Sequence, residues 1–398
     1  MTARAAAGVL AAAAISTACG APAEGALRPA YGGTARFATS ESLRRIDPPG
    51  AFSVVEQIAS RSVFEALPSL AGFVAEPGDT LWRFTLPRGL LFHDGSPCDA
   101  AAVRFSLEAS LDAAALLAPA PEPFADSTAA LVIAIAAPAD TVVEIALAAP
   151  GDLPRVLDDP RHAIASRSGA GTGAFRVALA RADARPGAVA LRLEAFDDHR
   201  MGRPYLDAIE FVRASGAADE WRLFTEGRAD LIAEPAAPAL ATAVVAAPDS
   251  SLVVIRMPSP LPVFAGAIAR AIRPEKMLRF LPRGFGVAPA LKPPFGRSDN
   301  GEVPSGATCA VSAPAGDPAL GRVAERVQVD LLDAGIAARV VEPGTPGALD
   351  VLETCRREPP AGSLALLTHE RRFAVSAALA GAGVRGCGPD LEWAWRRP

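Results

Sequence analysis

The sequence predicts an α/β protein with more than one domain. A chain of 398 residues is too long for one small core, which points to two domains or three. Half of its residues are hydrophobic and 21% are charged, so a sizeable core can be buried and wholesale disorder is excluded. Segments with strand patterns alternate with segments of helical periodicity, and no internal repeat is present.

In the first 150 residues the pattern predicts two helices and four strands. The helix at 54–66 carries Val54, Ile58, Val63 and Ala66 at the spacing of an amphipathic helix. The two strands near position 140 are expected to pair around a Pro-Ala-Asp turn. The predicted elements are strands at 33–38, 81–86, 131–136 and 141–147 and helices at 54–66 and 97–111.

The rest of the chain continues the alternation. Gly335 directly follows the last predicted helix, as is common at a helix end, and Pro274 interrupts the helix before it. The predicted strands lie at 189–195, 208–212, 229–233, 251–257 and 336–341, and the predicted helices at 217–226, 264–281 and 320–334. This order of elements is α/β in character, with insertions.

The amino terminus has the pattern of an export signal. Residues 1–18 contain one cation, Arg4, and then a run of small apolar residues that is too short to span a bilayer. The sequence ending in Cys19 resembles a bacterial lipobox, in which Cys19 is lipidated and begins the mature chain. The competing interpretation is an ordinary cut after residues 21–23, which removes Cys19. Both place the mature protein outside the cytoplasm, and residues 19–32 are predicted to be a flexible tether.

Charge and cysteine spacing exclude several classes of function. The formal charge is −5 and no basic cluster is present, so no nucleic-acid partner is expected. The four cysteines after the signal region allow two disulfides in an oxidising compartment, and buried free thiols are the open alternative. No zinc-site spacing and no hydrolase or phosphate-loop motif is present, so we expect no metal, no cofactor and no catalytic residue. These cysteines are Cys98, Cys309, Cys355 and Cys387.

Six blocks, in order, resemble one protein family. The first, residues 82–108, begins Trp-Arg-Phe-Thr-Leu-Pro, passes through Phe-His-Asp-Gly and continues into Asp-Ala-Ala-Ala-Val. The other blocks are Gly-Thr-Gly-Ala-Phe at 171–175, Arg-Pro-Tyr-Leu-Asp at 203–207, Glu-Gly-Arg-Ala-Asp at 226–230, Ala-Ile-Ala-Arg-Ala-Ile at 267–272 and Leu-Leu-Asp-Ala-Gly-Ile at 331–336. Over residues 33–342 the chain thereby resembles the extracellular solute-binding proteins of family 5, the peptide/nickel type.

The resemblance implies a two-lobed periplasmic-binding-protein-like fold with an extra subdomain in lobe I. Lobe I is then expected at 33–258, with the subdomain at about 48–165, lobe II at 259–365, and a return to lobe I at 366–398. The resemblance also implies a monomer, and not an enzyme. The implied function is to capture a small peptide-like or other polar solute in the interlobe cleft and to deliver this solute to the permease and ATPase of an ABC importer.

The same resemblance places ligand-facing groups after the first strand, and we expect further candidates just past the strand that ends at Ala233 and at two adjacent arginines later in the chain. A carboxylate there pairs with a ligand cation, and an arginine binds a carboxylate or phosphate through two hydrogen bonds. The expected ligand-facing residues are Ser40, Glu41, Ser42, Glu234, Arg356 and Arg357.

The chain departs from the family in its second lobe. It is shorter than typical members, and the Trp-x-x-Asp segment with which peptide-binding relatives hold the ligand's amino group has no counterpart between Val341 and Glu370. One alternative function is therefore a degenerate sensor or envelope interaction module without transport. The other is an exported hydrolase, which requires a polar triad converging in the cleft.

Overall fold

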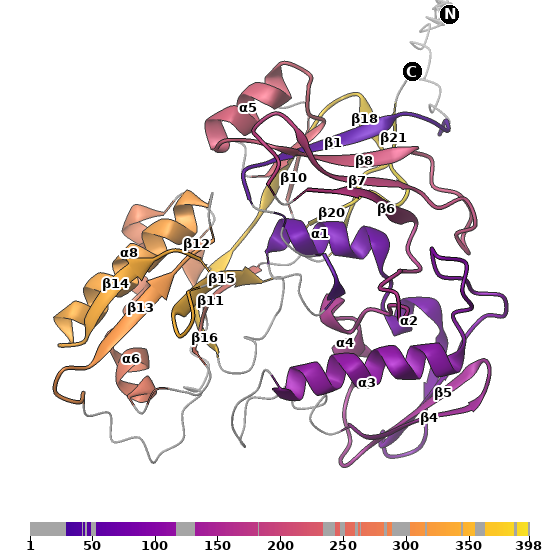
Figure 1. Ribbon diagram of the computed structural model, residues 1–398, viewed down its shortest axis with the longest axis horizontal. Helices are drawn as coiled ribbons and strands as arrows, with labels where there is room; N and C mark the ends of the chain where they lie inside the picture. Colours follow the sequence, from indigo (N-terminus) through magenta and orange to yellow (C-terminus); the bar gives the residue numbers. More distant parts are fainter. Residues whose placement is uncertain are drawn as a thin grey trace, which may run out of the picture.

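The computed structural model shows two lobes, each built on its own β-sheet, and a smaller subdomain (Figure 1). The structure describes residues 29–41, 43, 46–48, 53–116, 132–181, 183–233, 243–246, 251–258, 262, 264–281, 285–288, 303–314, 317–343, 345–354, 363–385 and 388–396. The expected signal peptide, Cys19 and most of the expected tether lie outside these residues. Within them, every helix is too short or too polar to pass through a lipid bilayer.

Lobe I is built on a seven-stranded sheet with the order β10-β17-β9-β1-β8-β7-β6. β1 lies at its centre and runs parallel to β8 on one side and to β9 on the other, while the outer strands pair antiparallel. The strands are β1 (Thr34–Thr39), β6 (Phe175–Ala180), β7 (Val189–Ala195), β8 (Ala208–Arg213), β9 (Leu231–Ala233), β10 (Ala243–Ala246) and β17 (Arg372–Val375).

Two helices cover opposite faces of this sheet. α1 (Val54–Val63) packs its buried residues into one cluster with Phe37 of β1, whereas α5 (Ala217–Thr225) packs into another with Ala38. Successive side chains of a strand point to opposite faces, so the neighbours Phe37 and Ala38 face different helices. The centre of the sheet is therefore buried on both sides, and functional groups are left to its edges and strand ends.

Lobe II is built on a six-stranded sheet with the order β12-β16-β11-β15-β13-β14. Its longest helix, α8 (Pro318–Asp333), connects the parallel strands β13 and β14 and buries an apolar stripe at helical spacing. The strands are β11 (Ser251–Arg256), β12 (Phe285–Val287), β13 (Thr308–Ser312), β14 (Ala337–Val341), β15 (Leu349–Thr354) and β16 (Ser363–His369), and the short helices are α6 (Ala265–Ala271), α7 (Pro274–Met277) and η5 (Leu278–Phe280).

The subdomain has a four-stranded antiparallel sheet with the order β2-β3-β5-β4. α3 lies along this sheet (Figure 1), and the side chains of Phe84, Leu107 and Ile145 meet in a core of their own. The elements are α2 (Leu67–Leu70), β2 (Gly72–Ala75), β3 (Leu81–Thr85), α3 (Ala100–Leu116), β4 (Val132–Ala139), β5 (Val142–Leu147), α4 (Leu153–Leu157) and η3 (Pro160–His162).

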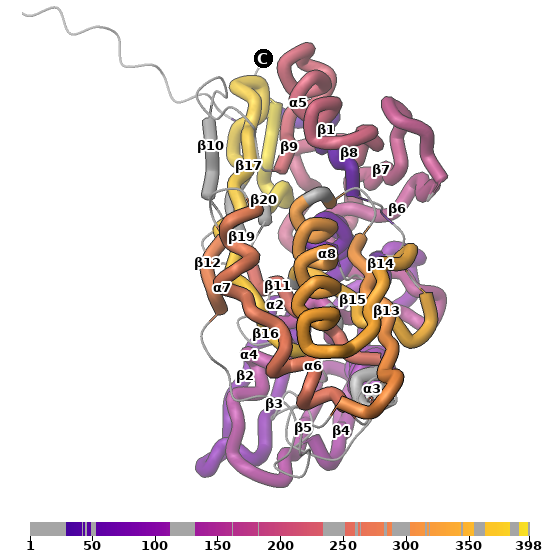
Figure 2. The backbone as a smooth tube through the Cα atoms, turned by 90° about the vertical axis from the view of Figure 1, so that its left-hand side faces the viewer, coloured from indigo at the N-terminus to yellow at the C-terminus, as the bar shows by residue number. Residues whose placement is uncertain are grey.

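The described strands change from one lobe to the other at two points along the chain. It leaves lobe I after β10 and enters lobe II at β11, and it returns from β16 directly into β17 with only Glu370 and Arg371 between them. Figure 2 shows β10 and β17 in one lobe and β11 and β16 in the other. The remaining strands follow β17 and finish lobe I: β18 (Leu379–Ala380), β19 (Gly383–Arg385), β20 (Gly388–Asp390) and β21 (Trp395–Arg396).

Several predicted boundaries move by a few residues. β11 lies within the range expected for lobe I but pairs with β15 and β16 of lobe II, and β16 extends past the expected return at 366. α1 ends at Val63, because Phe64 adopts an extended conformation. α3 begins at Ala100, because Asp99 caps its amino end: the carboxylate of Asp99 accepts a hydrogen bond from the backbone N–H of Ala102 at 2.8 Å.

The cysteine alternatives are partly resolved. Cys98 is a buried free thiol and Cys309 is a half-buried free thiol. Burial raises the pKa of the Cys98 thiol to about 12 and that of Cys309 to about 11, so both are inert thiols near neutral pH. Cys355 and Cys387 lie outside the described residues.

Candidate functional site

The structure describes two of the six predicted ligand-facing residues, Ser40 and Glu41. The others, Ser42, Glu234, Arg356 and Arg357, lie outside the described residues. Ser40 and Glu41 follow the carboxyl end of β1, the central strand of lobe I. In open α/β sheets ligands bind outside the carboxyl ends of parallel strands, so this edge is where a site is expected.

Lobe I holds the backbone at Ser40 from two directions. The backbone N–H of Ser40 donates to the carboxylate of Glu220 in α5, and its carbonyl accepts from the guanidinium of Arg213 at the end of β8. The hydroxyl of Thr39 accepts from the backbone N–H of Glu41 at 3.1 Å. These contacts fix the direction in which Glu41 leaves the strand, which is toward lobe II.

Arg371 joins the two lobes. It lies on the short crossing between β16 and β17, and its guanidinium binds both carboxylate oxygens of Glu353 in β15, with Nε–Oε1 at 2.9 Å and Nη2–Oε2 at 2.6 Å. Its Nη1 also lies 3.4 Å from Oε1 of Glu41. The side chain of Arg371 is 4% exposed and that of Glu41 is 13% exposed. One cation on the crossing therefore contacts a carboxylate from each lobe.

Lobe II supports Glu353 with further polar groups. Nδ1 of His369 lies 3.0 Å from Oε1 of Glu353, and the hydroxyl of Ser251 donates to the same oxygen. The ring of His369 stacks on Phe285, with ring centroids 3.8 Å apart and an interplanar angle of 12°. Strands β11 and β16 thus each supply a polar partner for Glu353 of β15, and β12 supplies the ring that stacks on His369. We call Glu41, Glu353, His369 and Arg371 the junction cluster.

The junction cluster gives its two glutamates opposite pKa shifts. Burial raises the pKa of Glu41 to about 7; the carboxylates of Asp317 and Glu353 act in the same direction, and Arg371 opposes them. Burial also tends to raise the pKa of Glu353, but the charge and hydrogen bonds of Arg371 and the hydrogen bond of His369 outweigh it and hold that pKa well below its usual range. Arg371 is therefore paired mainly with Glu353, and Glu41 is the carboxylate that titrates near neutral pH.

We expect the stability of the protein to fall between pH 5 and pH 7 because of Glu41. Its pKa of about 7 in the folded state exceeds the ordinary value of 4.5, so the folded state binds the proton more tightly than the unfolded state. This contribution is complete below pH 4.5 and is lost as the pH rises through 7. Between pH 5 and pH 7 the loss is about 2 kcal/mol. The contribution of Glu353 changes only at lower pH, because its pKa is shifted downward. Thermal unfolding across the pH range measures the fall.

Replacing Glu41 with glutamine should flatten this pH dependence, since glutamine keeps the shape of the side chain and does not titrate. The matched control is Glu76→Gln, because Glu76 is 52% exposed in a surface pair with Arg83 and should leave the curve unchanged. Equal curves for wild type and Glu41→Gln would show that Glu41 does not carry the pH dependence.

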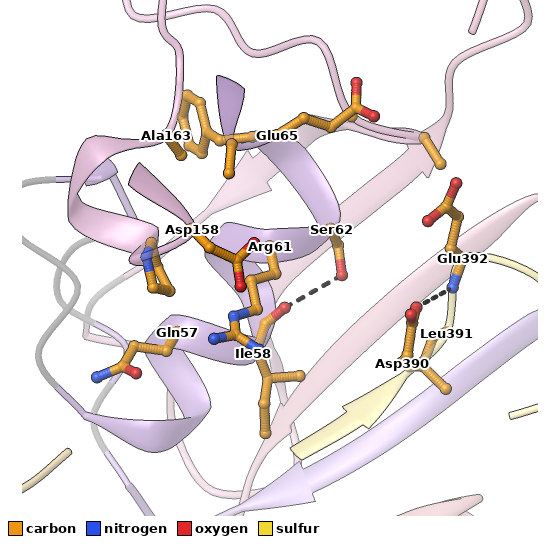
Figure 3. A pocket seen from close by; sticks show the side chains of 15 residues that line it. Gln57, Ile58, Arg61, Ser62, Glu65, Asp158, Ala163, Asp390, Leu391 and Glu392 are labelled. Carbon is orange, nitrogen blue, oxygen red and sulfur yellow. Dashed lines mark hydrogen bonds between the residues drawn. The ribbon is translucent and has the colours of Figure 1, made fainter. Parts of the chain in front are cut away.

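A separate cavity of about 60 Å³ lies inside lobe I, between α1, the turn at 158–163 and the segment 390–392 (Figure 3). Hydrogen bonds in its lining include two that Figure 3 marks: the hydroxyl of Ser62 donates to the carbonyl of Ile58 at 3.2 Å, and the backbone N–H of Glu392 donates to the carboxylate of Asp390 at 3.0 Å. Small-molecule sites usually measure about 300–1,000 Å³, so this cavity has room for water and not for a peptide or an opine. Among the described residues, no group of three His, Cys, Asp or Glu side chains is arranged to hold a metal ion.

Sequence reasoning identified Glu41 but missed its partners. Glu353 and His369 come from strands that had no predicted range, and Arg371, on the crossing after one of them, is 330 positions from Glu41. One signal was present: Glu370, Arg371 and Arg372 form a charged run between two apolar segments. Arginine and glutamate are seldom buried, so such a run favours a short connection between two buried segments.

A protein-family model and a curated relative match the chain. The model described as bacterial extracellular solute-binding proteins, family 5 middle, matches residues 65–263. An uncharacterised protein of Bacillus subtilis strain 168, YhjP, is 30% identical over 199 residues, which cover 46% of this chain. The match covers 32% of YhjP, so the chain spans about a third of the length of this relative.

Solved structures with the same fold cover nearly the whole chain. AgaA from A. tumefaciens R10, in complex with agropinic acid, is 15% identical with a TM-score of 0.70, covering 92% of this chain and 99% of AgaA. AppA from Bacillus subtilis, an oligopeptide-binding protein in complex with a nonapeptide, is 15% identical with a TM-score of 0.67, covering 93% and 100%. MoaA, also from A. tumefaciens R10 and in complex with mannopinic acid, is 14% identical with a TM-score of 0.67, covering 93% and 100%. These matches confirm the two-lobed binding-protein fold expected from the sequence.

Proposed function

Because the chain belongs to the bacterial extracellular solute-binding proteins of family 5, we propose that it is the solute-binding component of an ABC importer. It captures a small polar solute between lobes I and II and delivers it to a membrane permease that works with an ATPase. Export through residues 1–18 and a lipid on Cys19 keep it at the outer face of a membrane, and it acts as a monomer. The proposal assigns the chain to binding and transport, not to catalysis.

The observation that carries this proposal is the junction cluster between the lobes. Binding proteins of this type work by hinge closure, in which a ligand stabilises the closed arrangement. The crossing from β16 to β17 is short, and Arg371 on this crossing contacts a carboxylate from each lobe. The polar contacts that change when the lobes move are thereby concentrated where the chain crosses between them.

The remaining predicted residues are proposed as further ligand contacts. Glu234 comes directly after β9 in the sequence, as Ser40 comes after β1, and these two strands run parallel, so the carboxyl ends of β1 and β9 lie at the same edge of the sheet. Arg356 and Arg357 come two and three positions after the end of β15, which carries Glu353. We assign Glu234 to a ligand cation and the two arginines to a ligand carboxylate or phosphate.

The ligand class proposed is a polar molecule that carries both an amine and an acid group. The neighbours with this fold are described in complex with agropinic acid, a nonapeptide and mannopinic acid. The acidic residues at the lobe I edge and the arginines after β15 suit the two ends of such a molecule. A peptide held by a Trp-x-x-Asp segment is not proposed, because the sequence has no such segment between Val341 and Glu370.

Thermal unfolding of the exported chain against a ligand panel tests the function. The panel contains peptides, amino acids, opines, sugars and nickel complexes. A ligand present at 100 times its dissociation constant should add about 2.7 kcal/mol to the free energy of unfolding and raise the midpoint by several degrees. The shift must saturate with concentration. A cooperative transition that no class of ligand moves contradicts transport and favours the degenerate interaction module.

A further inference from the structure

Both tyrosines of the chain and one of its four tryptophans meet at one place on the surface. The rings of Tyr31 and Tyr205 have centroids 5.1 Å apart, and those of Tyr205 and Trp393 have centroids 6.3 Å apart. Tyr31 is 66% exposed and Trp393 is 40% exposed. Aromatic residues make up only 6% of the sequence, so three exposed or half-buried rings in contact are an unusual concentration for this chain. We call these three residues the aromatic patch.

The backbone holds the aromatic patch in place. Gly32 and Gly33 adopt positive φ angles of 117° and 85°, which L side chains rarely reach. The backbone N–H of Gly32 donates to the carbonyl of Tyr205 at 2.8 Å, and that of Gly33 donates to the carboxylate of Asp207 at 3.0 Å. The tyrosine rings are therefore presented by a fixed turn at the entry to β1.

The aromatic patch lies at the opposite end of β1 from the junction cluster. Tyr31 precedes β1 and Glu41 follows it, and a six-residue strand is about 20 Å long. The rings therefore do not belong to the proposed ligand site. The guanidinium of Arg203 lies over the ring of Tyr31, 5.6 Å from its centroid, and also pairs with Asp197 and Asp207. The rim of the patch is thus polar and carries one cation and two carboxylates.

The position and chemistry of the patch suit the surface of a lipid bilayer. Tyr and Trp are enriched at membrane–water interfaces, where the ring is buried and the polar tip stays hydrated. Tyr31 is 31 − 19 = 12 residues from Cys19, and a chain of that length reaches at most about 40 Å. A lipid on Cys19 therefore keeps the patch close to the membrane, where a weak contact is strengthened by high effective concentration.

We propose that the aromatic patch Tyr31, Tyr205 and Trp393 rests on the lipid–water interface and orients lobe I on the membrane. The inference rests on the lipid anchor in the proposed function. Contact at one end of β1 leaves the opposite end, with the junction cluster and the lobe II side, directed away from the bilayer. While it collects its solute, the protein is then held in one orientation instead of rotating freely on its tether.

Tryptophan quenching by brominated lipid tests the contact. The full chain is produced with its own leader, purified with its lipid and incorporated into phosphatidylcholine–phosphatidylglycerol vesicles that contain acyl-brominated lipid. We expect brominated lipid to lower the emission of the wild type, and Trp393→Phe to lose this drop. Trp221→Phe is the matched control and should keep it, because Trp221 lies on α5 and stacks on Phe224 (5.9 Å). Tyr31→Ser should reduce the drop.

Two results overturn the proposal. The first is equal quenching of Trp393→Phe and wild type, although both chains float with the vesicles. The second is protection of Trp393 from acrylamide in the absence of vesicles, because the chain itself or a second copy then covers the patch. If Cys19 carries no lipid, a hexahistidine tag in place of residues 1–19 and nickel-chelating lipid supply the anchor. The same quenching comparison then decides about the patch separately from the anchor and from ligand binding.

Discussion

Replacing Arg371 with methionine should lower the free energy of unfolding by about 3–5 kcal/mol, because it leaves a buried carboxylate without its partner. Both oxygens of Glu353 bind the guanidinium at 2.9 and 2.6 Å, and the side chain of Glu353 is 3% exposed. Methionine fills a similar volume, so the loss reports the charge and not a cavity. Chemical denaturation and thermal unfolding measure it. The loss should be smaller at low pH, where protonation of Glu353 removes the unpaired charge.

The double variant Arg371→Met with Glu353→Gln should recover part of the loss, since the uncompensated charge is then gone. The control for removing an arginine as such is Arg104→Met. Arg104 pairs with Glu108 at 3.4 Å on the exposed face of α3, with both side chains 48% exposed, and its loss should cost less than about 0.5 kcal/mol. If Arg371→Met destabilises no more than Arg104→Met, the junction cluster does not fasten the lobes.

The position of Arg371 makes this pair more than a stabilising contact. The arginine is part of the crossing between the lobes, so any hinge motion there moves the guanidinium relative to Glu41 or Glu353. Arg371 binds Glu353 at 2.9 and 2.6 Å but lies 3.4 Å from Glu41, and the directions of the two pKa shifts agree with a stronger bond to Glu353. Opening of the lobes is therefore expected to release Glu41 first and to keep Arg371 with lobe II.

The sequence predicted those helices and strands whose apolar periodicity and end signals lie within one continuous segment. The strand predicted at 189–195 is β7 with the same bounds, and the predicted interruption at Pro274 separates α6 from α7. β13, β15 and β16 were missed because a strand buried in the middle of a sheet does not alternate between apolar and polar residues. β16 reads Ser-Leu-Ala-Leu-Leu-Thr-His, a short apolar run that periodicity does not distinguish from a helix.

The candidate site was predictable only on one side. The end of β1 is recognisable from the sequence, and Glu41 is there. Its contact with Arg371 depends on how a strand near the carboxyl terminus returns to lobe I, and no pattern within either segment encodes that pairing. Sheet topology decides which residues hundreds of positions apart come into contact, and local periodicity does not determine that topology.

The Gly-Thr-Gly block at 171–173 was recognised from the sequence, and the structure explains why its two glycines are needed. Its backbone passes directly against the carboxyl end of α1, where the N–H of Gly173 donates to the carbonyl of Val63 at 2.9 Å. A Cβ atom added at Gly171 would meet the carbonyl oxygen of Val63 at 1.9 Å, and one at Gly173 would meet the oxygen of Ser62 at 2.7 Å. Only glycine permits this approach, because the opposing atoms belong to the backbone.

Gly171→Ala should therefore destabilise the protein by about 3 kcal/mol or more, at the upper end of what overpacking costs. Either α1 must move away from the strand that carries the block, or the block must leave α1 and lose its hydrogen bond. Thermal unfolding measures the loss, and Gly321→Ala is the matched control. Gly321 lies within α8 with open space at its Cβ position, so alanine there should stabilise the helix by about 0.5–1 kcal/mol. Opposite signs for the same substitution in one chain separate close packing from helix propensity, and a Gly171→Ala variant as stable as wild type would refute the close approach.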